Sequence, residues 1–217
     1  MRRTDLAMAY DFDLFVIGGG SGGISSARRA ASHGAKVALA ENDRLGGTCV
    51  NRGCVPKKLM VYASHFPKYV DESHGYGWKF ETGVFCWETM ITAVRNEVKR
   101  LNAIYQRMVY NAEVSLYRQY DKLLDAHTVE VGDEKVTAER ILIAVGGEPV
   151  KPDIPGIEHA ITSDGMFELN KQPERMVILG GGYIGCEFAC IMNGLGTEVS
   201  VVIRKEQILN GVDDDLR

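Results

Sequence analysis

The stretch DLFVIGGGSGG, residues 13–23, decides how the N-terminal part of this chain folds. After Asp13 comes a run of four apolar residues of strand-forming types, which ends at a glycine and predicts a buried strand. Three glycines follow with the spacing GxGxxG: Gly18, Gly20 and Gly23. The first permits a tight turn, the second lets a pyrophosphate approach the backbone, and the third allows a helix to pack closely on the strand. The pattern predicts a strand–turn–helix unit whose helix N-terminus faces a phosphate.

The next residues extend this unit. Residues 24–32 (ISSARRAAS) are rich in alanine, and Gly34 lies just past them, which predicts a helix that ends there. Residues 36–40 (KVALA) read as a second buried strand that ends at Glu41. An acidic residue at this position accepts hydrogen bonds from a ribose diol. We therefore expect a dinucleotide site, and the alternative is a glycine turn without a ligand.

The same pattern returns near the end of the sequence. Residues 175–179 (RMVIL) predict a strand, residues 183–193 a helix and residues 198–203 (EVSVVI) a second strand. The glycines of this second motif lie 162 residues after those of the first, at Gly180, Gly182 and Gly185. The chain is thus expected to hold two copies of a nucleotide-binding strand–helix–strand half-motif.

The two copies differ in charge at the end of the second strand. Where the first has Glu41, the second has Arg204 and Lys205. An acid there repels a 2′-phosphate, whereas an arginine accepts it. The second copy therefore favours NADPH over NADH, and the alternative is a solvated basic pair.

Composition excludes several classes of function. The 217 residues are 45% hydrophobic and 25% charged, with a formal net charge of −4, so there is no basic footprint for nucleic acid. No apolar run reaches the roughly 18 residues of a membrane span. Five cysteines are an odd number, which argues against the disulfide framework of a small secreted domain and favours a cytoplasmic setting. The histidines are scattered without metal-ligand spacing, so no metal is expected.

Two cysteines lie close together between the glycine motifs. The segment GGTCVNRGCVPKK, residues 46–58, holds Cys49 and Cys54 with Gly53 between them. A helix N-terminus and nearby lysines lower the pKa of a thiol and favour the reactive thiolate. A metal knuckle needs a second pair of ligands, and a structural disulfide is rare in the cytoplasm. The two thiols can therefore close a small disulfide loop at the start of a helix.

The middle of the chain predicts further elements. Residues 56–70 and 87–115 read as helices, and residues 115–137 read as antiparallel strands with a turn at Gly132 and Asp133. Residues 139–145 (ERILIAV) predict another buried strand, and three prolines between residues 149 and 155 predict an extended connection.

The cysteine segment, placed after the first glycine motif and its acid, resembles the active-site segment of the flavoprotein disulfide reductases. The resemblance covers essentially the whole chain and includes LNAIYQ, ILIAVGG, ITSDG and GGGYIGCEFA. Within that family the chain is similar to the members that reduce glutathione disulfide. The resemblance implies an α/β fold with an FAD-binding Rossmann-like domain of three layers (ββα) over residues 11–157. The start of an NADPH-binding Rossmann-like domain follows over residues 158–217.

The resemblance also implies a mechanism. In this family NADPH gives hydride to FAD, the flavin reduces the disulfide, and the dithiol reduces the substrate. Cys54 matches the thiol next to the flavin, and Cys49 matches the interchange thiol that attacks glutathione disulfide. The exchange chemistry needs a thiolate at Cys49.

Further site residues are implied by matching positions. Lys57 matches the lysine near flavin N5, Glu187 its ion-pair partner, and Tyr183 the tyrosine that covers the nicotinamide pocket. The matched FAD contacts are Ser21, Gly22 and Thr48, beside the first glycine motif. The matched glutathione-site positions are Ser21, Arg28, Ile104 and Tyr105. Taken singly, a surface lysine, a helix-face glutamate and a core tyrosine are the ordinary alternatives.

Some positions depart from the family pattern. Met108 stands where a polar residue of the glutathione site is expected, and Asn210 stands where many members have a second arginine for the 2′-phosphate. Val145 replaces a threonine of the usual ATGG. Lipoamide, trypanothione and mercuric reductases are the alternatives within the family, and the residues around Arg28, Lys57 and Arg204 favour glutathione.

Family members run to roughly twice this length. The resemblance therefore leads us to expect the N-terminal portion of a homodimeric enzyme that lacks the dimer-interface domain, with its His–Glu pair. On this expectation the 217-residue form alone is inactive. The competing hypothesis is a truncated, non-catalytic flavin-fold fragment.

Overall fold

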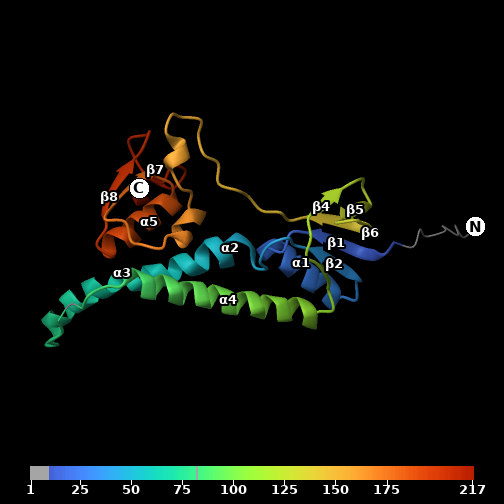
Figure 1. Ribbon diagram of the computed structural model, residues 1–217, viewed down its shortest axis with the longest axis horizontal. Coiled ribbons are helices and arrows are strands. Elements are labelled where there is room, and N and C mark those ends of the chain that lie inside the picture. Colours follow the sequence, from blue (N-terminus) through green and yellow to red (C-terminus); the bar gives the residue numbers. More distant parts are fainter. Residues whose placement is uncertain (1–9, 82) are drawn as a thin grey trace, which may run out of the picture. The chain divides into compact units, whose positions relative to one another are not determined.

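The computed structural model describes residues 10–81 and 83–217, and Figure 1 shows its helices and strands. Residue contacts divide the chain into two compact units that interleave in sequence. Unit 1 holds the described residues up to Asn51 together with Lys99–Glu148, and unit 2 holds Arg52–Val98 and Pro149–Arg217. These units are defined by contacts, whereas the domain boundary expected near residue 157 is defined by motifs and stays a prediction.

Unit 1 contains a six-stranded sheet with the strand order β3-β2-β1-β6-β5-β4. The strands are β1 (Phe12–Ile17), β2 (Val37–Ala40), β3 (Ser115–Tyr117), β4 (Asp121–Leu123), β5 (Thr128–Val131) and β6 (Glu134–Ile143). β1 pairs in parallel with both β2 and β6, and β2 pairs in parallel with β3. The parallel core follows from the helical crossover between β1 and β2, α1 (Ser21–Ser32).

β6 is the strand that joins the two kinds of pairing. Its first residues pair antiparallel with β5, and β4 pairs antiparallel with the other edge of β5. Its later residues, from Ala138 on, pair in parallel with β1. The sequence predicted the hairpin turn at Gly132 correctly, but it treated residues 139–145 as a separate strand. The structure corrects this, because one continuous strand serves both the hairpin and the parallel sheet.

Side chains on opposite faces of the sheet enter different cores. Phe15 and Ile17 of β1 pack with residues of β5 and β6, whereas Val16 packs with α1 and with the last turns of α4 (Trp87–Asn111). This alternation is the period of two expected of a strand that is buried on both faces. The expected three-layer ββα architecture is therefore confirmed for unit 1.

Unit 2 contains a parallel pair of strands, β7 (Arg175–Leu179) and β8 (Glu198–Val202), which are connected through α5 (Tyr183–Gly194). α5 packs against α3 (Cys54–Ser73). Met60 of α3, Ile91 of α4 and Met192 of α5 lie in one buried cluster. The remaining elements are α2 (Gly47–Arg52) and the 3₁₀ helices η1 (His74–Tyr76), η2 (Ile157–His159), η3 (Asp164–Glu168) and η4 (Asp214–Leu216).

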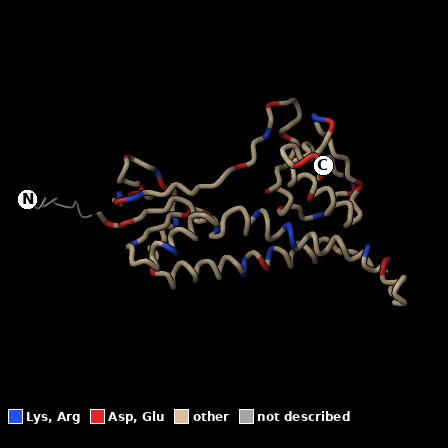
Figure 2. Tube along the Cα trace, turned by 180° about the vertical axis from the view of Figure 1, so that it is seen from behind, with Lys and Arg blue, Asp and Glu red and all other residues tan. Residues whose placement is uncertain are grey.

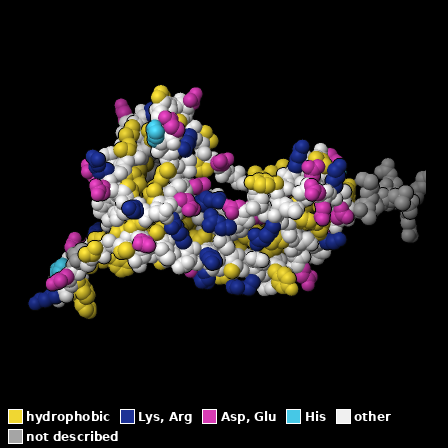
Figure 3. All heavy atoms as spheres, in the orientation of Figure 1, with side chains coloured by type: hydrophobic (Ala, Val, Ile, Leu, Met, Phe, Trp, Pro, Cys, Tyr) yellow, Lys and Arg dark blue, Asp and Glu magenta, His cyan; other side chains and the backbone are white. Residues whose placement is uncertain are grey.

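Charged side chains of both signs are mixed along the chain, and unit 2 has exposed apolar side chains. Lysines and arginines are interspersed with aspartates and glutamates along the chain in Figure 2. Apolar side chains reach the surface of unit 2 in Figure 3, and Val177 and Leu179 of β7 are among the exposed ones. A sheet of only two strands leaves such side chains uncovered.

Two glycines of α1 allow a direct test of how closely this helix packs on the loop after β1. A Cβ atom at position 23 would lie 1.8 Å from the carbonyl oxygen of Gly18, whereas a Cβ atom at position 22 would meet nothing within 4 Å. We expect Gly23→Ala to lower the free energy of unfolding by about 1–3 kcal/mol or more, since α1 must move off the loop. Urea denaturation measures the change.

Gly22→Ala is the matched control in the same helix turn. Because alanine is the better helix former, it is expected to leave the stability unchanged or to raise it by up to about 1 kcal/mol. Equal losses in the two variants would show that close packing is not what position 23 requires.

Candidate functional site

The first glycine loop has the geometry of a phosphate-binding turn. Gly18 has a φ of +105°, and a Cβ there would lie 2.4 Å from the carbonyl oxygen of Ala144, so only glycine fits. Gly20 is the N-cap of α1 in an extended conformation, without a side-chain capping bond. The first N–H groups of α1 are thus left for an anion, together with the positive end of the helix dipole.

The second glycine loop shares the positive φ and the open helix cap of the first. Gly180 has a φ of +118°, and a Cβ on Gly185 would lie 2.6 Å from the carbonyl oxygen of Gly180. Gly182 is the N-cap of α5, again without a side-chain capping bond. A Cβ on Gly182 would meet nothing within 4 Å, so the backbone is open to an approaching group. The two loops are therefore alike in three dimensions as well as in sequence, and both fit a pyrophosphate.

Glu41 directly follows β2, and its side chain is hydrogen-bonded to the first glycine loop. The N–H of Gly19 donates to one carboxylate oxygen of Glu41, and the N–H of Asp43 donates to the other, each at 2.8 Å. The N–H of Glu41 itself donates to the carbonyl oxygen of Tyr117 at 2.9 Å. Each carboxylate oxygen retains a second lone pair that can accept a ribose hydroxyl. The binding of a ribose by Glu41 stays a prediction.

The segment that follows Glu41 is held against the same loop. The N–H of Gly46 donates to the carbonyl oxygen of Gly19 at 2.9 Å. Gly47 has a φ of +62°, and a Cβ there would lie 2.6 Å from the Cα atom of Gly20. We call residues 41–47 the bridging loop, because they run from the end of β2 to the start of α2.

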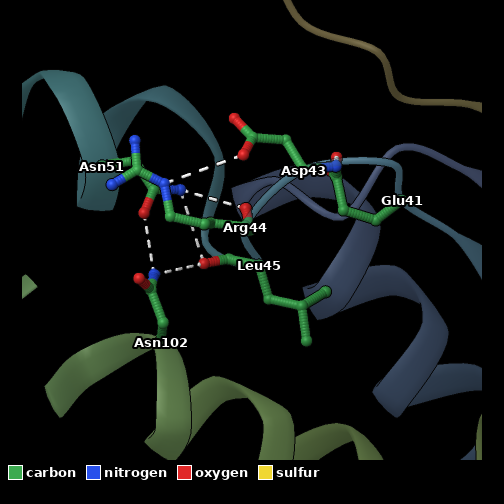
Figure 4. A network of polar contacts seen from close by, with 6 residues as sticks. All are labelled: Glu41, Asp43, Arg44, Leu45, Asn51 and Asn102. Atoms are coloured by element: carbon green, nitrogen blue, oxygen red, sulfur yellow. Dashed lines mark hydrogen bonds and ion pairs between the residues drawn. The ribbon is translucent and has the colours of Figure 1, made fainter. Parts of the chain in front are cut away.

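Two asparagines that sequence reasoning did not single out hold the bridging loop on its other side (Figure 4). The side-chain amide of Asn51 on α2 donates to the carbonyl oxygen of Arg44 at 3.0 Å. The amide of Asn102 on α4 donates to the carbonyl oxygen of Leu45 at 2.9 Å and to Oδ1 of Asn51 at 2.7 Å. Residues 51 apart in sequence give no local signal of such a contact.

The two cysteines of the predicted redox pair lie on successive helices. α2 carries Thr48 and the half-buried Cys49, and α3 begins at Cys54, which is exposed. Gly53 precedes α3 as its N-cap, and its carbonyl oxygen accepts the N–H of Lys57. The structure gives all five cysteines as thiols, so the pairing of Cys49 with Cys54 stays a prediction.

A pocket in unit 2 adjoins the second glycine loop. It has a volume of about 430 Å³. Its lining combines the glycine loop, the ends of β7 and β8, and polar side chains that include Arg204, Lys205, Gln207 and Asn210. The Nζ atom of Lys205 donates to Oδ1 of Asn210 at 2.6 Å. The structure thus places the two basic residues beside the second glycine loop.

Lys57 makes an ion pair with Glu187 inside unit 2. The ammonium of Lys57 contacts a carboxylate oxygen of Glu187, and the two side chains are 12% and 42% exposed. The same ammonium lies 5.4 Å from the ring centroid of Tyr183. The carboxylate of Glu187 and the aromatic ring of Tyr183 both stabilise the charge of this mostly buried ammonium. The roles of these residues toward a cofactor stay predictions.

The positions expected to contact glutathione are spread over two helices of unit 1. Arg28 lies on the exposed face of α1, as Ser21 does at its start. Ile104 and Tyr105 lie on α4, where both are half-buried and Tyr105 packs against the helix-side core. Their grouping into one substrate site stays a prediction.

Asp121 of β4 is a second residue that sequence reasoning did not single out. Its Oδ2 atom is buried and has no hydrogen-bond partner among the described residues. Burial raises the pKa of this carboxyl, and the negative charge of Glu41 raises it further, against the lowering effect of its own N–H. An uncompensated carboxylate close to the predicted ribose acceptor costs stability when it is ionised.

Two features are absent from residues 10–81 and 83–217. No group of three or more histidine, cysteine, aspartate and glutamate side chains is placed to hold a metal ion. None of the helices in these residues is both long enough and apolar enough to cross a membrane.

Comparisons with known proteins agree on one family. The family model described as pyridine nucleotide-disulphide oxidoreductase matches residues 12–217. The chain is 54% identical over 210 residues to a glutathione reductase of Nostoc sp., which covers 97% of this chain and 46% of that protein. For a glutathione reductase of Burkholderia cepacia the identity is 49% over 208 residues, covering 96% and 46%.

A plant relative shows the same relation. The chain is 46% identical over 222 residues to the chloroplastic/mitochondrial glutathione reductase of Pisum sativum, which covers 97% of this chain and 40% of that protein. The chain therefore spans less than half the length of these three curated relatives.

The carboxyl of Asp121 leads to a prediction on pH. Its folded pKa lies above the unfolded value, so the folded state binds more protons, and stability is lost as the pH rises through the folded pKa. We expect Asp121→Asn to raise the free energy of unfolding at neutral pH by about 1 kcal/mol. The gain disappears as the pH falls through the raised pKa. Thermal unfolding across the pH range measures both.

Asp153→Asn serves as the control, because Asp153 is an exposed residue in the extended connection. It should leave the melting temperature unchanged at every pH. A neutral-pH destabilisation by Asp121→Asn would contradict the reading of Asp121 as an uncompensated charge.

Proposed function

The chain belongs to the pyridine nucleotide-disulphide oxidoreductase family, and we propose that it serves the NADPH-dependent reduction of glutathione disulfide through FAD and a redox-active Cys49–Cys54 pair. The observation that carries this proposal is the difference between two otherwise similar glycine loops. The first is followed by the carboxylate of Glu41, and the second by the cations Arg204 and Lys205. One chain thus has a site suited to a ribose diol and a site suited to a 2′-phosphate.

FAD is assigned to the loop of unit 1. The glycine cradle around Gly20 leaves backbone N–H groups for a pyrophosphate, and Glu41 offers acceptors for a ribose. When bound, FAD takes hydride from a reduced nicotinamide and delivers the electron pair to a disulfide. Lys57, paired with Glu187, supplies a positive charge that stabilises a reduced, anionic flavin.

NADPH is assigned to the pocket of unit 2. Arg204 and Lys205 line it together with the second glycine loop, and Asn210 holds the ammonium of Lys205. A guanidinium forms paired hydrogen bonds with phosphate oxygens, and an ammonium adds a point charge. Selection of NADPH over NADH therefore rests on Arg204 and Lys205, and Asn210 replaces a third cation.

The reduced cysteine pair carries out thiol–disulfide exchange. The thiolate of Cys49 attacks one sulfur of glutathione disulfide, the S–S bond breaks, and one glutathione leaves as a thiolate that takes up a proton. The thiolate of Cys54 then attacks the sulfur of Cys49, releases the second glutathione and forms the Cys49–Cys54 disulfide. The pair is oxidised by two electrons and glutathione disulfide is reduced by two.

The working form is proposed to be a homodimer in the cytoplasm. The homodimer is supported by the family resemblance alone, and the cytoplasmic setting by the odd number of cysteines. The direct assay of the activity is NADPH oxidation that depends on added glutathione disulfide, compared with lipoamide and mercuric ion as acceptors, in a chain extended to the length of the curated relatives. A rate with glutathione disulfide no higher than with the other acceptors would overturn the choice of substrate.

The order of the two cysteines is tested by trapping the intermediate. In reduced Cys54→Ser, we expect glutathione disulfide to leave glutathione bound to Cys49, because the thiol that resolves the mixed disulfide is missing. Peptide mass spectrometry locates the adduct. Cys49→Ser should carry no more glutathione on Cys54 than on Cys86, an exposed cysteine outside the pair. Adducts that favour Cys54 would reverse the assignment.

The choice of nucleotide is tested at Arg204. Arg204→Ala should weaken NADPH binding by about 10- to 100-fold, since it removes a charge-assisted hydrogen bond, while NADH binding stays within about twofold. Titration of the nicotinamide fluorescence gives both constants. Lys171→Ala, an exposed lysine of the same unit that lies outside the pocket, is the control. Equal weakening of both nucleotides would contradict a contact to the 2′-phosphate.

A further inference from the structure

The amide pair Asn51–Asn102 links the predicted interchange thiol to the nucleotide loop. Asn51 lies on α2, two residues after Cys49, and only 4% of it is exposed. Its Oδ1 atom accepts from the amide of Asn102 at 2.7 Å, and its own amide reaches the carbonyl oxygen of Arg44 at 3.0 Å and that of Leu45 at 3.5 Å. A buried side-chain amide whose N–H group and oxygen are both hydrogen-bonded is held in one position.

The bridging loop, which the two asparagines hold in place, is in turn hydrogen-bonded to the first glycine motif. Figure 4 shows the carbonyl oxygens of Arg44 and Leu45 turned toward the two asparagines, with Glu41 at the other end of the segment. Glu41 accepts the N–H of Gly19, and the carbonyl oxygen of Gly19 accepts the N–H of Gly46. Hydrogen bonds thus hold both sides of the bridging loop, and α2 starts where the loop ends.

The helix that carries Cys49 is too short to hold itself. α2 has six residues, and Val50 and Asn51 are its buried ones. Isolated helices below about 12 residues are marginal in water, so tertiary contacts must fix this one. Asn51 provides the polar contact, and Asn102 fixes Asn51 from α4.

We propose that Asn102 is a positioning residue that acts through Asn51 to hold α2, and with it the thiol of Cys49, against the bridging loop. The importance of Cys49 rests on the proposed function, but the positioning itself does not. The thiol should therefore respond to Asn102 in the absence of flavin, pyridine nucleotide and glutathione.

The test is the alkylation rate of each cysteine in the reduced 217-residue chain, measured with iodoacetamide and peptide mass spectrometry. Asn102→Leu removes the donor to Leu45 and to Asn51 at nearly constant size. Losing these two bonds corresponds to a change in local opening of about tenfold or more. We expect Cys49 to react about tenfold faster than in the unaltered chain, with Cys86 unchanged. Amide exchange of residues 47–52 should rise by the same factor.

Two control variants separate positioning from general destabilisation. Asn96→Leu makes the same substitution at an exposed position of α4 and should change nothing. Val129→Ala opens the other core of unit 1, where Val129 is fully buried, and lowers stability without touching α2. A merely structural role of Asn102 predicts equal Cys49 rates in Asn102→Leu and Val129→Ala at matched stability, and that result overturns the proposal.

If Asn102→Leu does not fold, Asn102→Asp serves as a second variant for the same test. It keeps the size and the acceptor but loses the donor, so it should accelerate Cys49 in the same way. An unchanged Cys49 rate in a folded Asn102→Asp or Asn102→Leu chain also overturns the proposal. Because the assay uses no substrate, its failure is distinct from a failure of the proposed enzymatic function.

Discussion

The close approach of α1 to the loop after β1 is the constraint on which the first nucleotide site depends. A Cβ on Gly23 would lie 1.8 Å from the carbonyl oxygen of Gly18, so the helix start can sit above the strand end only because that residue has no side chain. This approach sets the N-terminus of α1 beside the backbone of Gly20. The candidate anion site is made by the main chain, so its shape depends on this packing.

Other contacts of unit 1 extend from this loop. Glu41 accepts the N–H of Gly19, and Gly46 donates to its carbonyl oxygen, so the bridging loop is tied to the same turn. Asn51 and Asn102 hold the bridging loop from the opposite side. The candidate dinucleotide site and the helix of a candidate redox thiol are therefore parts of one hydrogen-bonded assembly. That arrangement suits an enzyme whose cysteine chemistry depends on a bound cofactor.

Local patterns predicted most of the strands, the long helices and both glycine turns, because each depends on neighbours within a few residues. They did not predict α2, and they treated β3 as antiparallel although it pairs in parallel with β2. The duplication was visible for the same reason: Gly180 repeats the positive φ of Gly18, and Gly185 repeats the close helix approach of Gly23. The continuity of β6 was missed, since it is decided by pairing with β1. The Asn51–Asn102 contact and the buried carboxyl of Asp121 also come from long-range packing, which the spacing of residues does not encode.

The central claim is that unit 1 binds a dinucleotide through its pyrophosphate and adenosine ribose. Equilibrium binding of FAD and FMN to this chain, with ADP as competitor, tests it most directly, because FMN has the flavin but neither the pyrophosphate nor the adenosine. We expect FAD to bind, ADP to displace it, and FMN to bind far more weakly. FMN binding as tight as that of FAD, or no binding of FAD and ADP at all, would contradict the account.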